Sequence, residues 1–189
     1  MKRILVYILL CTLSAGLNTA LYAKRCMNEL SSSLVRLHII AASDSDEDQN
    51  IKLAVRDEVL KAVEGYSAKA DKEEFLAAAE TAAKKYLDEH NISYTANAQF
   101  GKFYFPRKSY GGITLPAGEY NGIRVVLGAG GGHNWWCVMY PPMCVTGSGE
   151  VKPSRRTEKM LKKEMSGGTY KLISVNVEVK LKIVELLSR

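Results

Sequence analysis

Hydrophobic and polar positions change their period several times along this chain of 189 residues. Residues 34–41 are dense in β-branched and apolar side chains, and Arg36 and His38 alternate with apolar neighbours, which is typical of a strand. From Ile51 the apolar residues recur every four positions, which predicts an amphipathic helix. Either Ser45 with Asp48 or Asp44 with Glu47 supplies the N-cap and an acid in the first turn. Gly65 is the expected end of this helix.

A second helix is predicted from a capping pattern at Asp71–Glu74, and it stops at His90-Asn91. One face of this helix is apolar and rich in alanine, and it consists of Phe75, Leu76, Ala79, Ala83, Tyr86 and Leu87. The period then changes to two, which predicts a series of strands. These strands are residues 92–96, 99–105, 120–127 and 175–184, with a mobile loop or partial helix expected in 147–168.

The order of the predicted elements is strand, two helices, then strands. This order indicates an α+β fold, with a mostly antiparallel sheet and two helices packed on one face. Residues 34–189 form a single domain of this kind in the prediction.

The first residues have the pattern of an export signal. Lys2-Arg3 is followed by the apolar run Ile4–Leu13 and then by small residues. The run is short for a membrane span, but the apolar character extends to Ala23. Residues 1–23 are therefore predicted to be a signal peptide or a membrane anchor, and the polar residues 24–33 a linker. Membrane contact is expected only through this N-terminal segment.

Cysteines of an exported protein are expected to form disulfides, because disulfides persist in oxidising compartments. Cys137 and Cys144 are seven residues apart and flank Pro141-Pro142, which can turn the chain back on itself. We predict a disulfide between them. Two buried thiols, or a metal site joined by His133, are the alternatives. The metal site is short of ligands, and Cys26 is left without an assigned role.

Other familiar chemistry fits the sequence poorly. The acids Asp44, Asp46 and Asp48 lack the glycine and the glutamate of a calcium loop. The glycines of 128–132 lack the residues of a nucleotide-binding loop. The net charge of +6 is spread along the chain without interleaved aromatic residues, which argues against nucleic acid. We expect no cofactor, no metal and no catalytic residues; a Cys137–His133 nucleophile pair is the remaining enzymatic possibility.

Trp135-Trp136 is the strongest candidate for recognition. Adjacent residues in an extended segment face opposite sides, so one ring can enter the core while the other meets a partner. Packing of both rings in the core is the alternative. The candidate contact residues form a loop that the disulfide holds, and they are His133, Asn134, Trp135, Trp136, Pro141 and Pro142.

Several segments together resemble the stage II sporulation protein R family of endospore-forming bacteria. They include Arg36–Ser45, Phe105–Gly111 and Leu115–Tyr120, and the most specific one is Gly132–Cys144. The resemblance covers nearly the whole chain. Ala42 departs from the asparagine that the family more typically has there.

The resemblance implies an intercellular signal and not an enzyme. Family members are exported into the space between forespore and mother cell, where they activate a membrane-embedded aspartic protease that processes the sigma-E precursor. The expected partner is therefore that protease, and the cleaving carboxylates belong to it. An exported module that binds cell wall or peptidoglycan is the alternative function.

Overall fold

The computed structural model describes residues 1–64, 72–144, 153–174 and 178–187. Its helices and strands follow one another along the chain in this order: α1 (Lys2–Ser33), β1 (Val35–Ile40), α2 (Asp46–Ala62), α3 (Lys72–Glu89), β2 (Ala96–Phe105), β3 (Lys108–Tyr110), β4 (Ile113–Leu115), β5 (Gly118–Leu127), β6 (Asn134–Tyr140), α4 (Arg155–Glu164), α5 (Gly167–Ser174) and α6 (Glu178–Leu187). The predicted α+β class is confirmed.

A four-stranded sheet with the order β2-β5-β1-β6 forms the centre of the domain. β2 pairs antiparallel with β5, and β1 pairs antiparallel with β6. β1 and β5 are parallel, a pairing that requires a long crossover connection. α2, α3 and β2 lie in that connection. A separate two-stranded sheet joins β3 and β4. The sheet is mostly antiparallel, as predicted.

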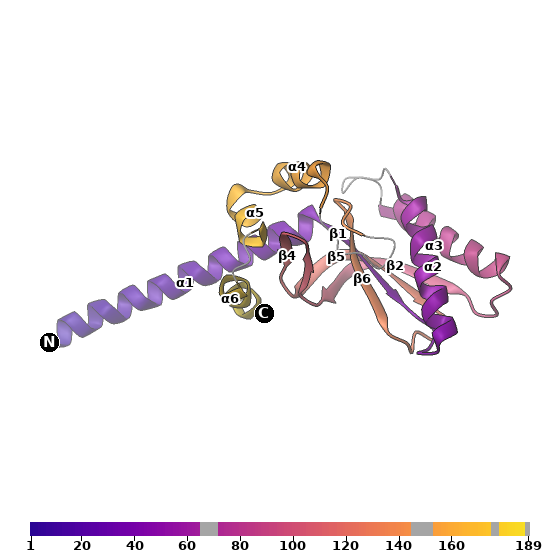
Figure 1. Cartoon of the computed structure of the whole chain (residues 1–189). Helices are drawn as coiled ribbons and strands as arrows, with labels where there is room; N and C mark the ends of the chain where they lie inside the picture. Colours follow the sequence, from indigo (N-terminus) through magenta and orange to yellow (C-terminus); the bar gives the residue numbers. More distant parts are fainter. Residues whose placement is uncertain (65–71, 145–152, 175–177, 188–189) are drawn as a thin grey trace.

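α2 and α3 cover one face of the sheet, on the right in Figure 1. Val55 and Val59 of α2 are fully buried, as are Ala79 and Ala83 of α3. The predicted apolar stripes therefore face the sheet, and we call the cluster they form with it the helix-pair core. The Ser45 hydroxyl accepts a hydrogen bond from the Asp48 N–H and caps α2 as expected. The proposed stop at Gly65 lies outside the described residues, as does Asp71.

The opposite face of the sheet is also covered, by a layer that the sequence reading did not foresee. The inner end of α1, the β3–β4 hairpin and the C-terminal helices meet there in a second core, which we call the rear core (Figure 1). Residues 24–33, which the sequence predicts to be a polar linker, are helical and partly buried in the structure. Met27 and Leu30 recur at helical spacing among the polar residues and point into the rear core.

Two further expectations need correction. Residues 178–187 form α6 and not a strand, since the alternating pattern of this segment also contains helical spacing: Leu181 and Val184 are three apart. Residues 175–177 lie outside the described part. In the segment 147–168 the partial helix is confirmed as α4, which Ser154 caps, and residues 147–152 lie outside the described part. Residues 92–95 precede β2 as turn and bend, and the strand begins at Ala96.

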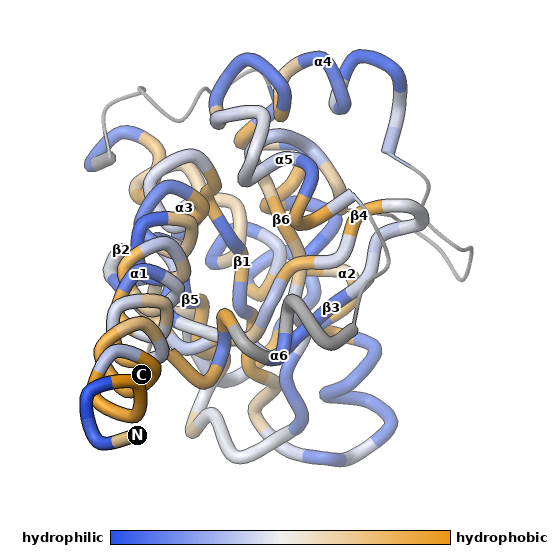
Figure 2. Tube along the Cα trace, turned by 90° about the vertical axis from the view of Figure 1, so that its left-hand side faces the viewer, coloured by the Kyte–Doolittle hydropathy of each residue, from blue (hydrophilic) through white to orange (hydrophobic). Residues whose placement is uncertain are grey.

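The outer part of α1 extends away from the domain (Figure 1). Its side chains are exposed up to Leu21 and Tyr22, and burial starts at Ala23. Figure 2 shows this part as largely hydrophobic beyond Lys2-Arg3. The helix is long and apolar enough to cross a membrane, and this length and composition are equally compatible with a signal sequence.

Candidate functional site

β6 is an edge strand of the main sheet and carries three of the predicted contact residues, Asn134, Trp135 and Trp136. His133 and Pro141 directly adjoin its two ends. Residues 134–140 pair with β1 throughout, with Trp136 opposite His38 and Trp135 opposite Ile39. The expected disulfide-held loop is therefore a strand followed by a short turn. The preceding glycines of 128–132 bring the chain back to the sheet after β5, with Gly128 and Gly130 at positive φ.

The two tryptophans lie on opposite faces of the sheet, as predicted. Trp135 packs against the helix-pair core, where the Arg56 guanidinium lies 4.4 Å from its ring centroid. The Lys108 ammonium lies 5.3 Å from the same centroid. Trp136 packs against the rear core. Both rings are half-buried, so each presents an edge at the surface while the rest is packed.

His38 belongs to the site, although its sequence signal indicated only strand alternation. Its ring stacks on Trp136 with centroids 3.6 Å apart, and Nε2–H donates to the Asn134 Oδ1 at 2.8 Å. Burial lowers the pKa of His38; the bond to Asn134 opposes this shift, and the charge of Arg124 adds to it. The folded domain therefore favours the neutral imidazole.

Arg36 is a second buried group that the prediction missed. Its side chain is fully buried between Phe105 and Tyr120, with the guanidinium carbon 4.2 Å and 4.8 Å from their ring centroids. None of its three nitrogens has a hydrogen-bond partner of good geometry among the described residues, although the nearby Tyr110 hydroxyl partly offsets the effect of burial on the pKa of Arg36. Burial lowers the pKa of Arg36. Phe105 in turn meets the edge of Trp136 at 5.1 Å, which links this buried cation to the site through packed rings.

The structure contains the predicted disulfide between Cys137 and Cys144, whose Cα atoms are 5.3 Å apart. The turn after β6 folds back so that the Met143 N–H donates to the Val138 carbonyl at 3.0 Å. Pro142 is exposed at its tip, whereas Pro141 is buried and unavailable for a direct contact. Cys26 is a free, buried thiol in α1.

His133 joins the start of β6 to the acidic segment before α2. Its Nδ1 lies 2.5 Å from the Asp44 Oδ1, and its backbone N–H donates to the same oxygen at 2.6 Å. The Lys52 ammonium donates to the His133 carbonyl at 3.1 Å. The bonds from His133 lower the pKa of the exposed Asp44 carboxyl. His133 and Asn134 are both exposed, so they form one polar surface with Asp44.

The groups gathered at this site are suited to contact with a partner. Cys137 is held in the disulfide, so the imagined Cys137–His133 nucleophile pair has no thiolate. Within the described ranges, no three His, Cys, Asp or Glu residues lie close enough together to hold a metal ion. The site instead offers aromatic edges, an imidazole, an amide and a carboxylate.

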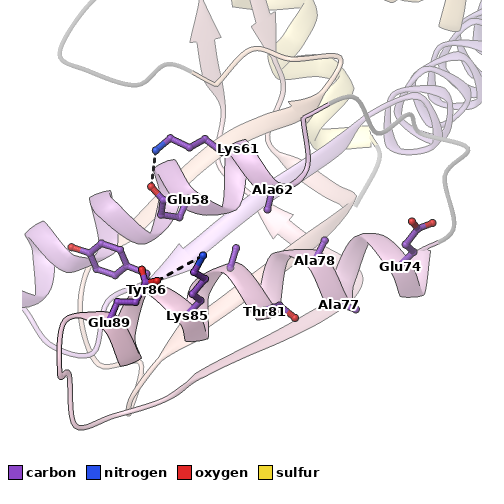
Figure 3. A pocket seen from close by; sticks show the side chains of 11 residues that line it. Glu58, Lys61, Ala62, Glu74, Ala77, Ala78, Thr81, Lys85, Tyr86 and Glu89 are labelled. Atoms are coloured by element: carbon purple, nitrogen blue, oxygen red, sulfur yellow. Dashed lines mark hydrogen bonds and ion pairs between the residues drawn. The ribbon is translucent and has the colours of Figure 1, made fainter.

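A groove of about 700 Å³ lies elsewhere, between α2 and α3 (Figure 3). Its floor is made of small side chains such as Ala62, Ala78 and Ala82. The ion pair Lys61–Glu58 lies along one rim, and Lys85–Glu89 along the other. The residues that line the groove include no catalytic nucleophile or general base that a neighbouring group activates, so we assign it no function.

The structure is thus a disulfide-bridged α+β domain that follows an apolar helix compatible with a signal sequence, and aromatic and polar groups gather along β6. The comparisons are specific. The family model described as stage II sporulation protein R matches residues 31–150, and the chain belongs to that family. Stage II sporulation protein R of Bacillus subtilis (strain 168) is 32% identical to it over 174 residues, which cover 85% of this chain and 78% of the relative. No solved structure matches.

Proposed function

We propose that this sporulation protein is an exported intercellular signal. It acts in the space between forespore and mother cell, where it activates a membrane-embedded aspartic protease that processes the sigma-E precursor. Family membership over most of the chain carries this proposal. The apolar N-terminal helix supports export, and the disulfide supports an oxidising compartment.

The receptor contact in this proposal is the outer edge of β6, together with the polar surface at its start. We call this region the β6 surface, and it comprises His133, Asn134, Trp135, Trp136 and Pro142. Tryptophan is a favoured anchor at protein interfaces, since one ring removes a large area from water at little conformational cost. The strand, the disulfide and the stacking on His38 fix these groups before binding, which reduces the entropy lost on association.

Activation requires that the β6 surface bind the active arrangement of the protease more tightly than the inactive one. A hundredfold shift in the equilibrium corresponds to about 2.7 kcal/mol of differential binding. One buried aromatic anchor and its neighbours can supply this amount. The signal itself therefore needs no catalytic group.

The proposal is tested by reconstitution. The full chain is exported beside the cognate protease and its sigma precursor, and precursor size is followed on a gel. Conversion that depends on the chain supports signalling. Absence of conversion, with folded signal and competent protease, contradicts it, and saturable binding to purified cell wall then favours the wall-binding function.

A further inference from the structure

The helix α4 brings several basic residues together on its outward side, although other residues separate them in the sequence. Its buried positions are Thr157 and Leu161, and its outward side carries basic residues. The exposed cations are Arg155, Arg156, Lys159, Lys162 and Lys163. Figure 2 shows α4 as a largely hydrophilic segment on the outer rim of the molecule. Arg155, Lys159 and Lys163 are spaced by four residues, so they form one stripe along the helix.

These cations lack the neutralising partners that other helices of the domain provide. Lys61 of α2 pairs with Glu58, and Lys84 and Lys85 of α3 pair with Glu80 and Glu89. Among the described residues, no ion pair involves Arg155, Arg156, Lys159 or Lys163. Like charges at four-residue spacing destabilise a helix, so this arrangement is unfavourable for folding alone.

The basic residues surround a hollow. A depression of about 370 Å³ is lined by Arg155, Arg156, Lys159, Met160 and Lys163. Met160 is half-buried within it, and methionine adapts its shape to different contact partners. A hollow with a thioether floor and a cationic rim fits a segment with carboxylate groups and short apolar side chains.

α4 is attached directly to the turn that ends the β6 surface. The Thr157 hydroxyl donates to the Pro142 carbonyl at 3.1 Å, and the Tyr140 hydroxyl donates to the Glu164 carboxylate at the same distance. The Ser33 hydroxyl donates to the Glu164 carbonyl at 2.8 Å, which ties α4 to the end of α1. A partner that binds at the exposed Pro142 therefore lies next to the basic helix α4.

We propose that the outward face of α4 binds an acidic segment of a protein partner, with carboxylates that pair with the Arg155, Lys159 and Lys163 stripe and an apolar side chain on Met160. The identification of that partner with the protease rests on the proposed function. A lipid surface fits less well, because helices that lie in a membrane interface insert large apolar side chains, and the outward face of α4 offers only Met160. Nucleic acid fits less well because that face has no aromatic ring for base stacking.

A peptide assay tests the face without reference to the protease. The full chain is held in neutral detergent, and fluorescence anisotropy follows binding of a labelled twenty-residue peptide rich in Glu and Leu, with a Gln and Leu peptide for comparison. The α4 variant Arg155→Glu/Lys159→Glu is compared with Lys102→Glu/Lys182→Glu, which exchanges two exposed lysines elsewhere for the same change in net charge. We expect a loss of at least tenfold in affinity for the acidic peptide in the α4 variant alone, and salt-dependent binding in the wild type. Equal affinity of the two variants overturns the proposal.

The reconstituted conversion assay and a vesicle assay complete the test. The α4 variant is expected to convert the sigma precursor at least tenfold more slowly than the control variant. If wild type fails to convert it, the proposed function fails, and the peptide result still decides the role of α4. Binding to phosphatidylglycerol vesicles that the α4 variant loses, with conversion unchanged, overturns the proposal in favour of lipid. Arg155→Gln/Lys159→Gln replaces the reversal variant if circular dichroism shows that the latter is unfolded.

Discussion

His38 and Trp136 stack across the β1–β6 ladder with their ring centroids 3.6 Å apart. The contact joins a central strand to the edge strand on the rear face of the sheet. Phe105 meets the same indole at 5.1 Å, and Arg36 lies over Phe105. The part of Trp136 that reaches the surface is thus supported by a row of buried rings.

Stability is expected to fall between pH 7.5 and pH 5 because of His38. Burial lowers its pKa in the folded domain, whereas the unfolded chain has the ordinary value of about 6.5. As the pH falls through that ordinary value, the unfolded state takes up the proton first, so stability present above it is lost. Urea unfolding at the two pH values measures the effect. His38→Gln should remove part of the loss, and His90→Gln, at an exposed position, should not. An unchanged pH dependence in His38→Gln contradicts the assignment.

Removal of the disulfide is expected to lower the free energy of unfolding by about 2–3 kcal/mol, as the chain-entropy model gives for so short a loop. Cys137→Ser/Cys144→Ser makes the change, and denaturant unfolding measures it. Cys11→Ser, at an exposed position, is a control for the loss of a cysteine outside the bridge. Equal stability of wild type and the double variant under oxidising conditions argues against a structural role for the bridge.

Arg36→Met is expected to raise the free energy of unfolding by about 1–4 kcal/mol, because an apolar side chain of similar length replaces a buried cation without hydrogen-bond partners of good geometry. Arg36→Ala leaves a cavity between Phe105 and Tyr120, and should be less stable than Arg36→Met by about 2–5 kcal/mol. Thermal and denaturant unfolding compare the two. Strong destabilisation of Arg36→Met would contradict this expectation and would show that the guanidinium makes stabilising interactions beyond its packing against Phe105 and Tyr120.

The inner end of α1 is expected to behave as part of the folded domain. Leu30 is fully buried in the rear core, so Leu30→Ala should lower the free energy of unfolding by about 2–5 kcal/mol. Leu21→Ala lies in the exposed part of the same helix and should change it by less than about 0.5 kcal/mol. Similar values for the two variants would support the linker that the sequence had indicated.

Local sequence patterns were enough for the helix-pair core. Ser45 caps α2, and the four-residue spacing of Ile51, Val55 and Val59 places them against the sheet. The close spacing of Cys137 and Cys144 led to their disulfide in the same way. In each case the interacting residues are near one another in the chain.

The rear core depends on contacts between distant segments, which local patterns do not reveal. The contact of Met27 with the Gly118 region joins the start of the chain to β5. Arg107 and Glu185 pair across 78 residues at 2.7 Å and hold α6 to the β3–β4 region. The sequence indicated that Arg36 is one of the polar residues that alternate with apolar ones along a strand. Both faces of β1 are covered in the structure, so Arg36 is buried. The charge of α4 also becomes a surface only when the helix forms.

The central claim is that the β6 surface activates the protease, and a matched pair of aromatic variants tests it most directly. Trp135 on β6 and Phe103 on β2 lie near opposite edges of the sheet, and each is half-buried with an arginine over its ring, Arg56 at 4.4 Å and Arg124 at 4.7 Å. Conversion of the sigma precursor is followed on a gel with exported wild type, Trp135→Ala and Phe103→Ala, at equal amounts of folded protein. We predict that Trp135→Ala loses most of the conversion, whereas Phe103→Ala retains it. Full conversion by Trp135→Ala, or an equal loss in both variants, contradicts the account.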